Sequence, residues 1–547
     1  MTELTALPAE RHRWENLLSR PDIEVHDGTV RLLDQATPAE AQRADLLMIA
    51  EALETAGIPV LLIRHGVRDL ALVVDAARRA DAYAALRRCG ADEPLYVKPR
   101  GGTAHLAVDL DDTRTDAIRT NAGAEAIRVY RPRRAGSLTF GAAQAVRLEF
   151  WRTEDGVVHA PRANALTRRV FVAADVEHVT VEREGRAWTT LRGMFDLQPD
   201  EIDFPIDMVF SWVDGSSSEF QRQRAAQMAE YVVGEGDDGP ARFRHVDELR
   251  YALRSVHLYA PWVRRIFIAT DSPAPAWLRD DPKVTIVRSE EFFADPSVLP
   301  THNSHAVEAQ LHRIEGLAEH FLYSNDDMFF ARPVGPELFF TAAGVSKFVE
   351  CPVRIGTGPS LAHRSGHDNA LRVNRALLED RFGRVILRDL EHCAAPLRRS
   401  VMRELEDAFP ADIARTAASR FRSATDVSVT NSLYHYFALM TGRAIATTVP
   451  RVRYVQTTMA ASLGEMQRLE RQGDVDMFCL NDGGAQELPE QLRVQTLRAT
   501  LERMFPIPAP WERATGRSAH PAGRAAEKTG AAAVSAARGG GEAPAPR

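Results

Sequence analysis

Apolar and polar positions divide the chain into two stretches that predict different architectures. Between about residues 40 and 200, helical spacing alternates with strand-like runs, and beyond about residue 105 single apolar and polar residues alternate between glycines and prolines. Strict alternation is typical of antiparallel strands with one solvated face. This stretch therefore predicts a mixed α/β unit. Its clearest elements are a helix, two strands and a second helix at 39–57, 58–66, 69–75 and 77–90.

From about residue 200 to 513, apolar strand-like segments alternate with amphipathic helices. This alternation predicts a mostly parallel sheet covered by helices. The last stretch is rich in alanine, glycine and proline, so burial cannot repay the entropy of ordering it, and we expect disorder there. The predicted organisation is a smaller α/β accessory unit at 1–200, a larger domain at 201–513 and a disordered tail at 514–547.

Acidic residues follow three predicted strands of the larger domain. In open α/β sheets ligands bind beyond the carboxyl ends of the strands, so acids at these ends are expected to converge on one crevice. The three strand-like segments, each with the residues that follow it, are 206–213 with Asp214-Gly215, 264–270 with Asp271, and 320–325 with Asp326-Asp327.

Asp326 and Asp327 are the predicted ligands of a divalent ion. Carboxylate oxygens suit Mg²⁺ or Mn²⁺, and substrate phosphates supply further ligands. Because successive side chains of a strand point to opposite sides, the two aspartates should have unequal roles, and Asp327 is favoured. Turn chemistry is the alternative explanation, since Asn and Asp are common in turns through local hydrogen bonds. The same alternative applies to Asp214-Gly215.

The segment 301–321 predicts a helix that leads into the next strand. Asn303 or Ser304 is the expected N-cap, and Glu308 and His312 should share one helical face. With His305 they form an H-x-x-E-x-x-x-H pattern that zinc ligands also adopt. A polar helix face lining a substrate cleft is the better explanation, because no cysteine or second histidine helix completes a zinc site.

Three later positions carry groups suited to phosphate chemistry. His392 precedes a predicted helix, Arg420 and Arg422 stand two apart, and Asn481-Asp482 follows an apolar run. If the arginine segment is extended, both guanidinium groups point the same way and suit phosphate oxygens. The alternative is an exposed Arg-x-Arg pair without a ligand.

Composition narrows the class of protein. A formal net charge of -7 over 547 residues and an isoelectric point near 6.2 lack the basic excess expected of a nucleic-acid partner. Four scattered cysteines without a Cys-x-x-Cys pair fit a reducing compartment. No apolar run approaches the ~20 residues of a membrane helix. We expect a cytoplasmic protein, and peripheral contact with the membrane through a lipid-linked acceptor stays open.

Four blocks of the chain, in order, resemble the conserved regions of the Stealth family. The first is IDMVFSWVDG, the long second begins ARFRHVDELRYALRS and ends at FLYSNDDMFF, the third begins LEHCAAPLRRS, and the fourth is MFCLNDGGAQ. The resemblance implies a Rossmann-like or GT-A-like catalytic domain that transfers a hexose 1-phosphate from a nucleotide sugar to a carbohydrate hydroxyl. The first 200 residues lie outside it. The four regions lie at about 205–220, 241–345, 389–445 and 476–505.

Site roles are carried over from the Stealth motifs position by position. The first block departs from the family, because Gly215 is followed by three serines where Stealth proteins continue Ser-Asp-Pro, and this weakens a metal role for the loop. The implied catalytic residues are Glu308, Asp327, His392, Arg422 and Asp482; the implied metal ligands are Asp326, Asp327 and Asp482; the implied substrate-binding residues are Asp214, Gly215, Asn325 and Arg420.

The resemblance also implies the reaction. The acceptor hydroxyl should attack the β-phosphorus of a UDP-sugar with Mg²⁺ or Mn²⁺ bound, forming a phosphodiester and releasing UMP, in synthesis of a cell-surface polysaccharide such as a capsule. Either His392 or Glu308 should accept the proton. One alternative is a metal-dependent glycosyltransferase that releases UDP. A second is a non-catalytic carbohydrate-binding protein, which would have no need of the strand-end acids.

Overall fold

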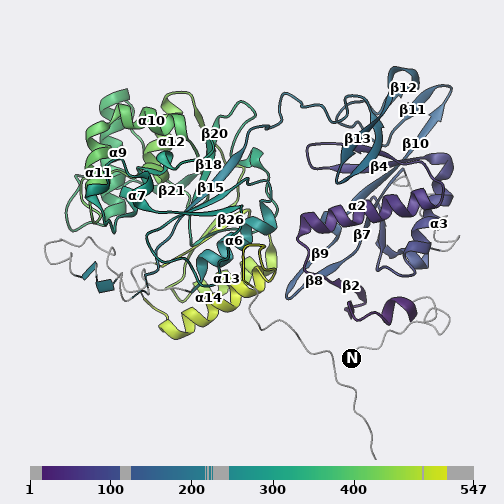
Figure 1. The fold of residues 1–547 in the computed structure, drawn as a ribbon, viewed down its shortest axis with the longest axis horizontal. Helices are drawn as coiled ribbons and strands as arrows, with labels where there is room; N and C mark the ends of the chain where they lie inside the picture. Colours follow the sequence, from purple (N-terminus) through teal and green to yellow (C-terminus); the bar gives the residue numbers. More distant parts are fainter. Residues whose placement is uncertain are drawn as a thin grey trace, which may run out of the picture.

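A computed structural model describes residues 15–110, 125–215, 217, 221–222, 224–225, 246–482 and 486–513. The predicted tail at 514–547 lies outside the described residues. Figure 1 shows two groups of elements, an N-terminal unit in purple to blue and a larger unit in teal to yellow. The predicted boundary near residue 200 falls in the segment between the last strand of the first group and the first strand of the second. Among the described helices, none is long and apolar enough to cross a bilayer.

The N-terminal unit is built on a mixed eight-stranded sheet. The strand order is β12-β11-β10-β7-β5-β6, and β4 joins it by pairing in parallel with β10 and antiparallel with β3. Helix α2 starts at a capping box of Thr37 and Glu40 with Pro38 in its first turn, a strong helix-start signal. The elements are α2 (Pro38–Thr55), β3 (Leu61–Arg64), β4 (Leu70–Asp75), α3 (Arg79–Cys89), β5 (Tyr96–Pro99), β6 (His105–Leu106), β7 (Ala126–Tyr130), β10 (Val146–Glu154), β11 (Val157–His159) and β12 (Val170–Val172).

Both helices pack on this sheet through their apolar stripes. Leu46, Ile49 and Leu53 of α2 lie one helical turn apart and are buried with Leu86 of α3 in one cluster. Smaller sheets complete the unit: β1 (Ile23–His26), β2 (Thr29–Leu33), β8 (Arg133–Ala135) and β9 (Leu138–Phe140) form one, and β13 (His178–Arg183) and β14 (Arg186–Leu191) form a hairpin.

Acidic residues at the ends of β4 have ordinary partners. Asp69 accepts a hydrogen bond from Arg162 at 2.8 Å, and Asp75 caps the following turn by accepting from the Ala77 amide. These contacts are those of an ion-paired carboxylate and of a capping carboxylate. The accessory role of this unit stays a prediction.

The larger domain is organised around a five-stranded sheet with the order β17-β16-β15-β18-β23. The first four strands are parallel, and only β23 runs antiparallel. This arrangement confirms the predicted mostly parallel sheet. The strands are β15 (Ile206–Ser211), β16 (Ile266–Ala269), β17 (Val284–Val287), β18 (His320–Asn325) and β23 (Ala395–Arg398).

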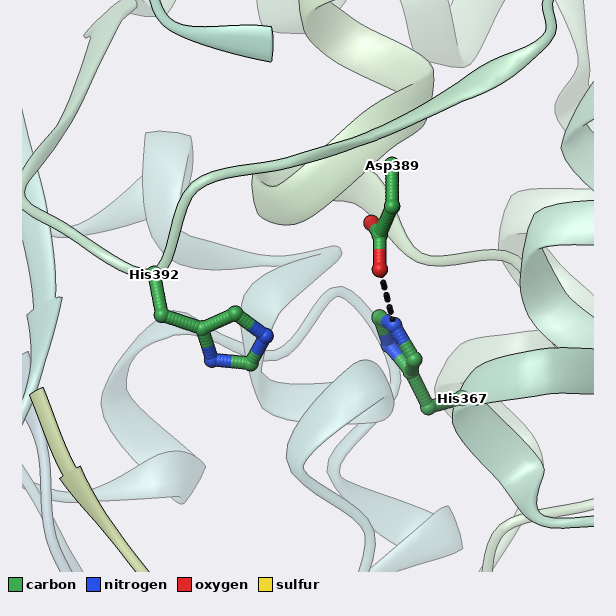
Figure 2. A group of neighbouring side chains, drawn as sticks. All are labelled: His367, Asp389 and His392. Atoms are coloured by element: carbon green, nitrogen blue, oxygen red, sulfur yellow. Dashed lines mark hydrogen bonds and ion pairs between the residues drawn. The ribbon is translucent and has the colours of Figure 1, made fainter. Parts of the chain in front are cut away.

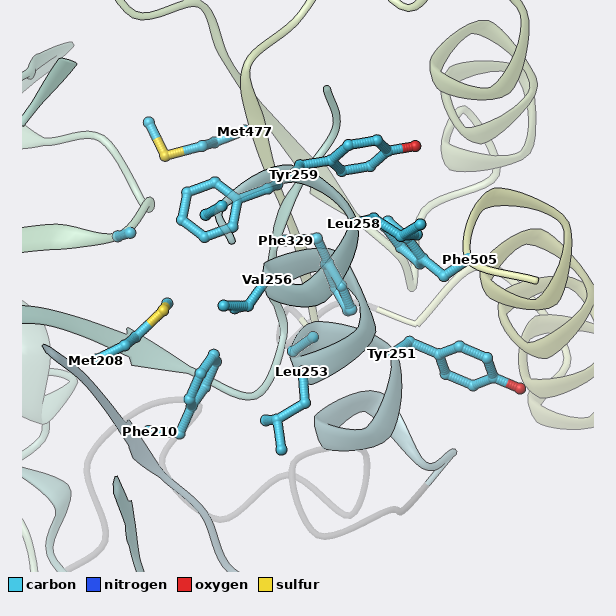
Figure 3. Packing of buried hydrophobic residues seen from close by; sticks show 14 of the residues in the cluster. Met208, Phe210, Tyr251, Leu253, Val256, Leu258, Tyr259, Phe329, Met477 and Phe505 are labelled. Atoms are coloured by element: carbon cyan, nitrogen blue, oxygen red, sulfur yellow. The ribbon is translucent and has the colours of Figure 1, made fainter. Parts of the chain in front are cut away.

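Each central strand buries both of its faces. Met208 and Phe210 of β15 enter one apolar cluster, whereas Val209 between them enters another on the opposite side. Figure 3 shows the first cluster, in which Met208 and Phe210 lie beside Val256 of helix α6. Burial on both sides explains why these strands are continuous apolar runs rather than alternating ones.

Helices and short strands cover the two faces. The helices are α6 (Glu248–Tyr259), α7 (Ser289–Phe292), α8 (Ser304–Glu308), α9 (Gly366–Phe382), α10 (Arg399–Ala408), α11 (Pro410–Ala418), α12 (Tyr434–Met440), α13 (Ser462–Gln472) and α14 (Glu490–Met504). The remaining strands are β19 (Met328–Phe330), β20 (Ser346–Phe348), β21 (Glu350–Arg354), β22 (Arg388–Leu390), β24 (Ala444–Ala446), β25 (Val452–Gln456) and β26 (Met477–Asn481).

The helix predicted for 301–321 is wrong in length. Asn303 is the N-cap, accepting from the His305 amide, but helix α8 ends at Glu308. Beyond it the Gln310 side chain accepts a hydrogen bond from Ala294, and His312 bonds to Glu406 at 2.9 Å. The backbone itself changes to bonds between residues three apart, from the Gln310 amide to Val307 and from the Arg313 amide to Gln310, so Glu308 and His312 do not share an α-helical face.

A buried ion pair joins the C-terminal segment to helix α6. Both oxygens of Glu512 accept bonds from Arg254, at 2.6 and 2.8 Å, and Arg250 adds a bond of 2.6 Å. Glu512→Gln leaves Arg254 buried without a counter-charge, so we expect the free energy of unfolding to fall by about 3 kcal/mol. Urea denaturation monitored by circular dichroism measures the change.

The matched control for this prediction is Glu502→Gln, an exposed position on α14. It should change the free energy of unfolding by no more than about 0.5 kcal/mol. Equal losses in both variants would contradict a special role for the Glu512 ion pair.

Candidate active site

The candidate site lies where the order of the parallel strands reverses. Chain connections run outward from β15 to β16 and β17, then return to place β18 on the other side of β15. At such a reversal the loops after the two central strands separate and leave a crevice at their carboxyl ends. Ser211 and Asn325, the last residues of β15 and β18, are paired at this edge. The sheet topology therefore fixes the location of a cleft.

The cleft has a volume of about 880 Å³ and gathers residues from distant parts of the chain. All five predicted catalytic residues are among its lining, as are Asn325 and Asp326. Their catalytic roles stay predictions, but the structure brings their side chains to one cavity. Further lining residues that matter below are Ser304, His305, His367, Asp389, Tyr454 and Asn481.

A second sheet brings Asp327 and Asp482 together. Strand β19 begins right after Asp327 and pairs antiparallel with β26, which ends right before Asp482, and Met328 lies opposite Cys479. The Leu480 amide donates to the main-chain oxygen of Asp327 at 2.9 Å. The antiparallel pairing thus brings together the start of β19 and the end of β26, which are about 150 residues apart in the sequence.

Asp327 is held in an environment that disfavours its charge. Burial raises the pKa of its carboxyl to about 6, the hydrogen bond from the Cys479 thiol opposes this rise, and the charge of Asp482 adds to it. The Cys479 Sγ lies 3.4 Å from Oδ2, while the buried Oδ1 has no hydrogen-bond partner. A buried carboxylate oxygen without a donor is costly unless a cation binds there.

Asp482 forms an ion pair with a buried arginine, Arg493. Its Oδ1 accepts bonds from Arg493 and from the Thr457 hydroxyl. Arg493 is fully buried on α14, and its Nε and second terminal nitrogen have no hydrogen-bond partner. The ion pair fixes one carboxylate oxygen of Asp482 and leaves Oδ2 for another ligand.

Glu308 sits at the end of α8 with almost no exposure to solvent. Its Oε2 accepts a bond of 2.6 Å from the Thr430 hydroxyl. Its Oε1 lies 3.3 Å from the Tyr323 hydroxyl, which makes a shorter bond of 2.8 Å to Asn325. Burial raises the pKa of Glu308, and the Thr430 hydrogen bond and the Arg422 charge oppose the rise. A carboxylate of raised pKa is a better proton acceptor near neutral pH.

Arg422 and Arg420 do not share the same surroundings. Arg422 lines the cleft and donates to the Ser304 hydroxyl at 2.9 Å. Arg420 is exposed and is not among the described residues that line the cleft. The segment that carries them is not a strand, so the condition for both guanidinium groups pointing the same way is not met. A substrate role for Arg420 stays a prediction without a contact in its favour.

His392 lines the cleft beside His367 and Asp389, two polar residues that the sequence did not single out. Burial lowers the pKa of His392 to about 4, and the charge of His367 acts in the same direction. His367 bonds to Asp389 at 2.9 Å. The ring of His392 lies edge to face with Tyr454 at 5.2 Å between centroids. His392 is therefore a neutral imidazole at neutral pH.

Asp214 and Gly215 stand just beyond the cleft. Trp212 and Val213 line it, whereas the next two residues are not among its described lining. The Asp214 amide donates to the Ser272 hydroxyl at 2.9 Å. Residues 216 and 218–220 of this loop lie outside the described part of the chain, so contact with a donor at Asp214 or Gly215 stays a prediction.

Sequence reasoning missed Arg493, Thr430, His367 and Asp389. Arg493 had a readable signal, because it shares an apolar stripe with Leu497 and Leu501, where an arginine is unusual. The other three gave none. Thr430 is one of several small polar residues in its segment, and His367 and Asp389 are 22 residues apart on different elements.

The cleft fits the predicted divalent ion of the magnesium type. The unpartnered Oδ1 of Asp327, the second oxygen of Asp482 and the carboxylate of Asp326 are hard oxygen donors, and all three residues line the cleft. Among the described residues these three do not form a compact ligand group by themselves. A magnesium ion here stays a prediction, in which one or two of these carboxylates would bind the ion and substrate phosphates and water would complete its shell.

The chain belongs to the Stealth family. The family models for Stealth protein conserved regions 1, 2, 3 and 4 match residues 204–232, 242–348, 391–439 and 467–522. These matches confirm the resemblance drawn from the four blocks.

Relatives extend the similarity over most of the chain. It is 50% identical over 497 residues to the exopolysaccharide phosphotransferase CpsY of Mycobacterium tuberculosis, covering 90% of this chain and 92% of the relative. It is 52% identical over 483 residues to an exopolysaccharide phosphotransferase of Nocardia farcinica, covering 88% and 90%. Among solved structures, the galactosyltransferase LgtC, in complex with donor and acceptor sugar analogs, matches at a TM-score of 0.30 and 13% identity, over 55% of this chain and 95% of that one.

Proposed function

We propose that this chain is an exopolysaccharide phosphotransferase that moves a sugar 1-phosphate from a UDP-sugar to a carbohydrate hydroxyl and releases UMP. The observation that carries the proposal is the convergence of Asp327, Asp482, Glu308 and Arg422 on one cleft at the strand-order reversal. Membership of the Stealth family and the names of the relatives support the same class of reaction.

The cleft walls supply the groups that phosphoryl transfer requires. Catalysis of this reaction consists mainly of positioning and of stabilising charge on the phosphate oxygens. Asp327 and Asp482, with Asp326 beside them, would hold Mg²⁺ or Mn²⁺, and the bound ion neutralises the diphosphate of the donor. Arg422 offers a guanidinium group to the transferred phosphate, and the Ser304 hydroxyl orients it.

In the proposed step, the acceptor oxygen forms a bond to the β-phosphorus of the donor. The bond from that phosphorus to the bridging oxygen breaks, and its electron pair leaves with UMP. The acceptor proton passes to Glu308, whose Oε1 has only a long contact of 3.3 Å to Tyr323. His392 is the second candidate base, but its lowered pKa makes it a weaker proton acceptor than Glu308.

Product analysis tests the function. Purified chain is incubated with Mg²⁺, a carbohydrate acceptor and a panel of UDP-sugars, and nucleotides and acceptor products are separated and weighed by mass spectrometry. We expect UMP together with an acceptor that has gained a sugar phosphate. Release of UDP with a glycoside product would instead identify a glycosyltransferase. Absence of turnover with every donor, despite measurable donor binding, would favour a carbohydrate-binding protein.

A further inference from the structure

A group of two histidines and one aspartate lines the cleft in addition to the strand-end acids. His367 lies in the first turn of α9, Asp389 on β22, and His392 three residues later in the loop before β23. The ligand atoms of these three side chains all lie within 4.8 Å of one another. Among the described residues, no other group of histidine, cysteine and acidic side chains reaches this spacing.

The arrangement of the three side chains leaves room between them. Figure 2 shows the His392 ring with one nitrogen facing the His367–Asp389 pair, from which it is separated by a gap. The His367 Nε2 and Asp389 Oδ2 are already 2.9 Å apart. Two ligands of a tetrahedral ion with bonds near 2.0 Å lie about 3.3 Å apart, so this pair needs only a small adjustment to bind one.

We propose that His367, Asp389 and His392 form a binding site for a divalent transition ion such as Zn²⁺. Two imidazoles and a carboxylate are the donor set that borderline ions prefer, whereas Mg²⁺ prefers oxygen ligands only. The site is therefore chemically distinct from the carboxylates Asp326, Asp327 and Asp482, which line the same cleft but do not belong to this group.

With three protein ligands, the proposed metal site would keep one coordination position open, as catalytic zinc sites do. Water or substrate would take that position, and all three side chains line the cleft. The side chains of His367 and Asp389 are 32% and 14% exposed, so an ion can reach them from the cleft. The second oxygen of Asp389 accepts a bond of 2.8 Å from the Leu390 amide, which fixes the orientation of the carboxylate.

The proposed site bears on the proton acceptor of the proposed transferase reaction, and this consequence rests on that function. An imidazole nitrogen that binds an ion cannot also accept a proton from the acceptor hydroxyl. An occupied site therefore leaves Glu308 as the base, in agreement with its raised pKa.

Calorimetric titration of Zn²⁺ into metal-free, tag-free protein tests the site without any need for turnover. We expect one ion per wild-type chain and at least about a hundred-fold weaker binding in His367→Ala and in Asp389→Asn, since even the loss of a supporting residue costs up to that much. His363→Ala, which removes an exposed histidine of the same segment, is the matched control and should bind like wild type.

Two further results separate this site from the predicted magnesium site. Asp327→Asn should leave Zn²⁺ binding intact, and an excess of Mg²⁺ should not displace the bound Zn²⁺. No saturable Zn²⁺ binding by wild type, or equal binding by wild type, His367→Ala and Asp389→Asn when circular dichroism shows all three folded, would overturn the proposal. Failure of the product assay with normal Zn²⁺ binding would count against the transferase function alone.

Discussion

Asp327→Asn should lower sugar-phosphate transfer by at least about a thousand-fold while the protein still folds. The substitution removes the negative charge of the carboxylate whose buried Oδ1 has no partner. A metal ion held by Asp327 would contribute several kcal/mol of charge stabilisation in the transition state, and each 1.4 kcal/mol corresponds to a factor of ten in rate. Initial rates of UMP release at saturating Mg²⁺ measure the effect.

Asp327→Asn should not destabilise the folded protein. Burial raises the pKa of Asp327 to about 6, so the charged form is disfavoured in the folded protein without an ion. Asparagine has the same shape and no charge, so the melting temperature of the ion-free variant should equal or exceed that of wild type. A loss of activity accompanied by unfolding would leave the catalytic assignment unsupported.

Asp271→Asn is the matched control for Asp327→Asn. Asp271 also follows a parallel strand of the same sheet, but its Oδ1 accepts a bond of 2.8 Å from the Ser289 amide, and it is not among the described residues lining the cleft. We expect transfer within a few-fold of wild type. Substantial activity in Asp327→Asn, or an equal loss in Asp271→Asn, would refute the special role of Asp327.

The difference between these two aspartates shows what the sequence could predict. Apolar runs that end in acids predicted strands of a parallel sheet, and Asp214, Asp271 and Asp327 do follow β15, β16 and β18. Which strand ends open into a crevice depends on strand order. The reversal lies between β15 and β18, so Asp327 faces the cleft while Asp271 caps α7.

The spacing of apolar residues gave a wrong prediction for the segment 301–321. Apolar spacing across 301–321 fits a long helix, yet helix α8 ends at Glu308, and the Gln310 and His312 side chains beyond it bond to residues far away in the sequence. The shorter helix places Glu308 at its end, where Thr430 can reach it. Periodicity alone contains no information about such partners.

Long-range pairs account for the rest of what the sequence did not predict. Arg493 and Asp482 are 11 residues apart, but their contact depends on how α14 packs behind β26. His367 and Asp389 meet only because α9 and β22 lie along the same cleft. The motif resemblance identified Asp482 and His392, whereas the residues that surround them needed the structure.

Glu308→Gln should lower transfer by about a hundred- to ten-thousand-fold, the range of a lost general base, and at the same time stabilise the fold at neutral pH. Glutamine keeps one oxygen that can accept the bond from the Thr430 hydroxyl, and its NH2 group can donate to the Tyr323 hydroxyl, which already donates to Asn325. The amide cannot take up the acceptor proton. Because burial raises the pKa of Glu308, its folded form binds a proton more tightly than its unfolded form. The contribution of Glu308 to stability is thus full below its unfolded pKa and is lost as pH rises through its folded pKa.

The pH dependence separates catalysis from structure at this position. Thermal melts from about pH 5 to about pH 8 should show the melting temperature of Glu308→Gln exceeding that of wild type by an amount that grows with pH. Glu315→Gln, an exposed position in the segment after α8, should change neither the melts nor the rate of transfer. If Glu308→Gln keeps most of its activity, the proton passes to another group, and His392 becomes the base. If the variant is less stable than wild type at every pH, the carboxylate is a structural acceptor whose charge the fold requires.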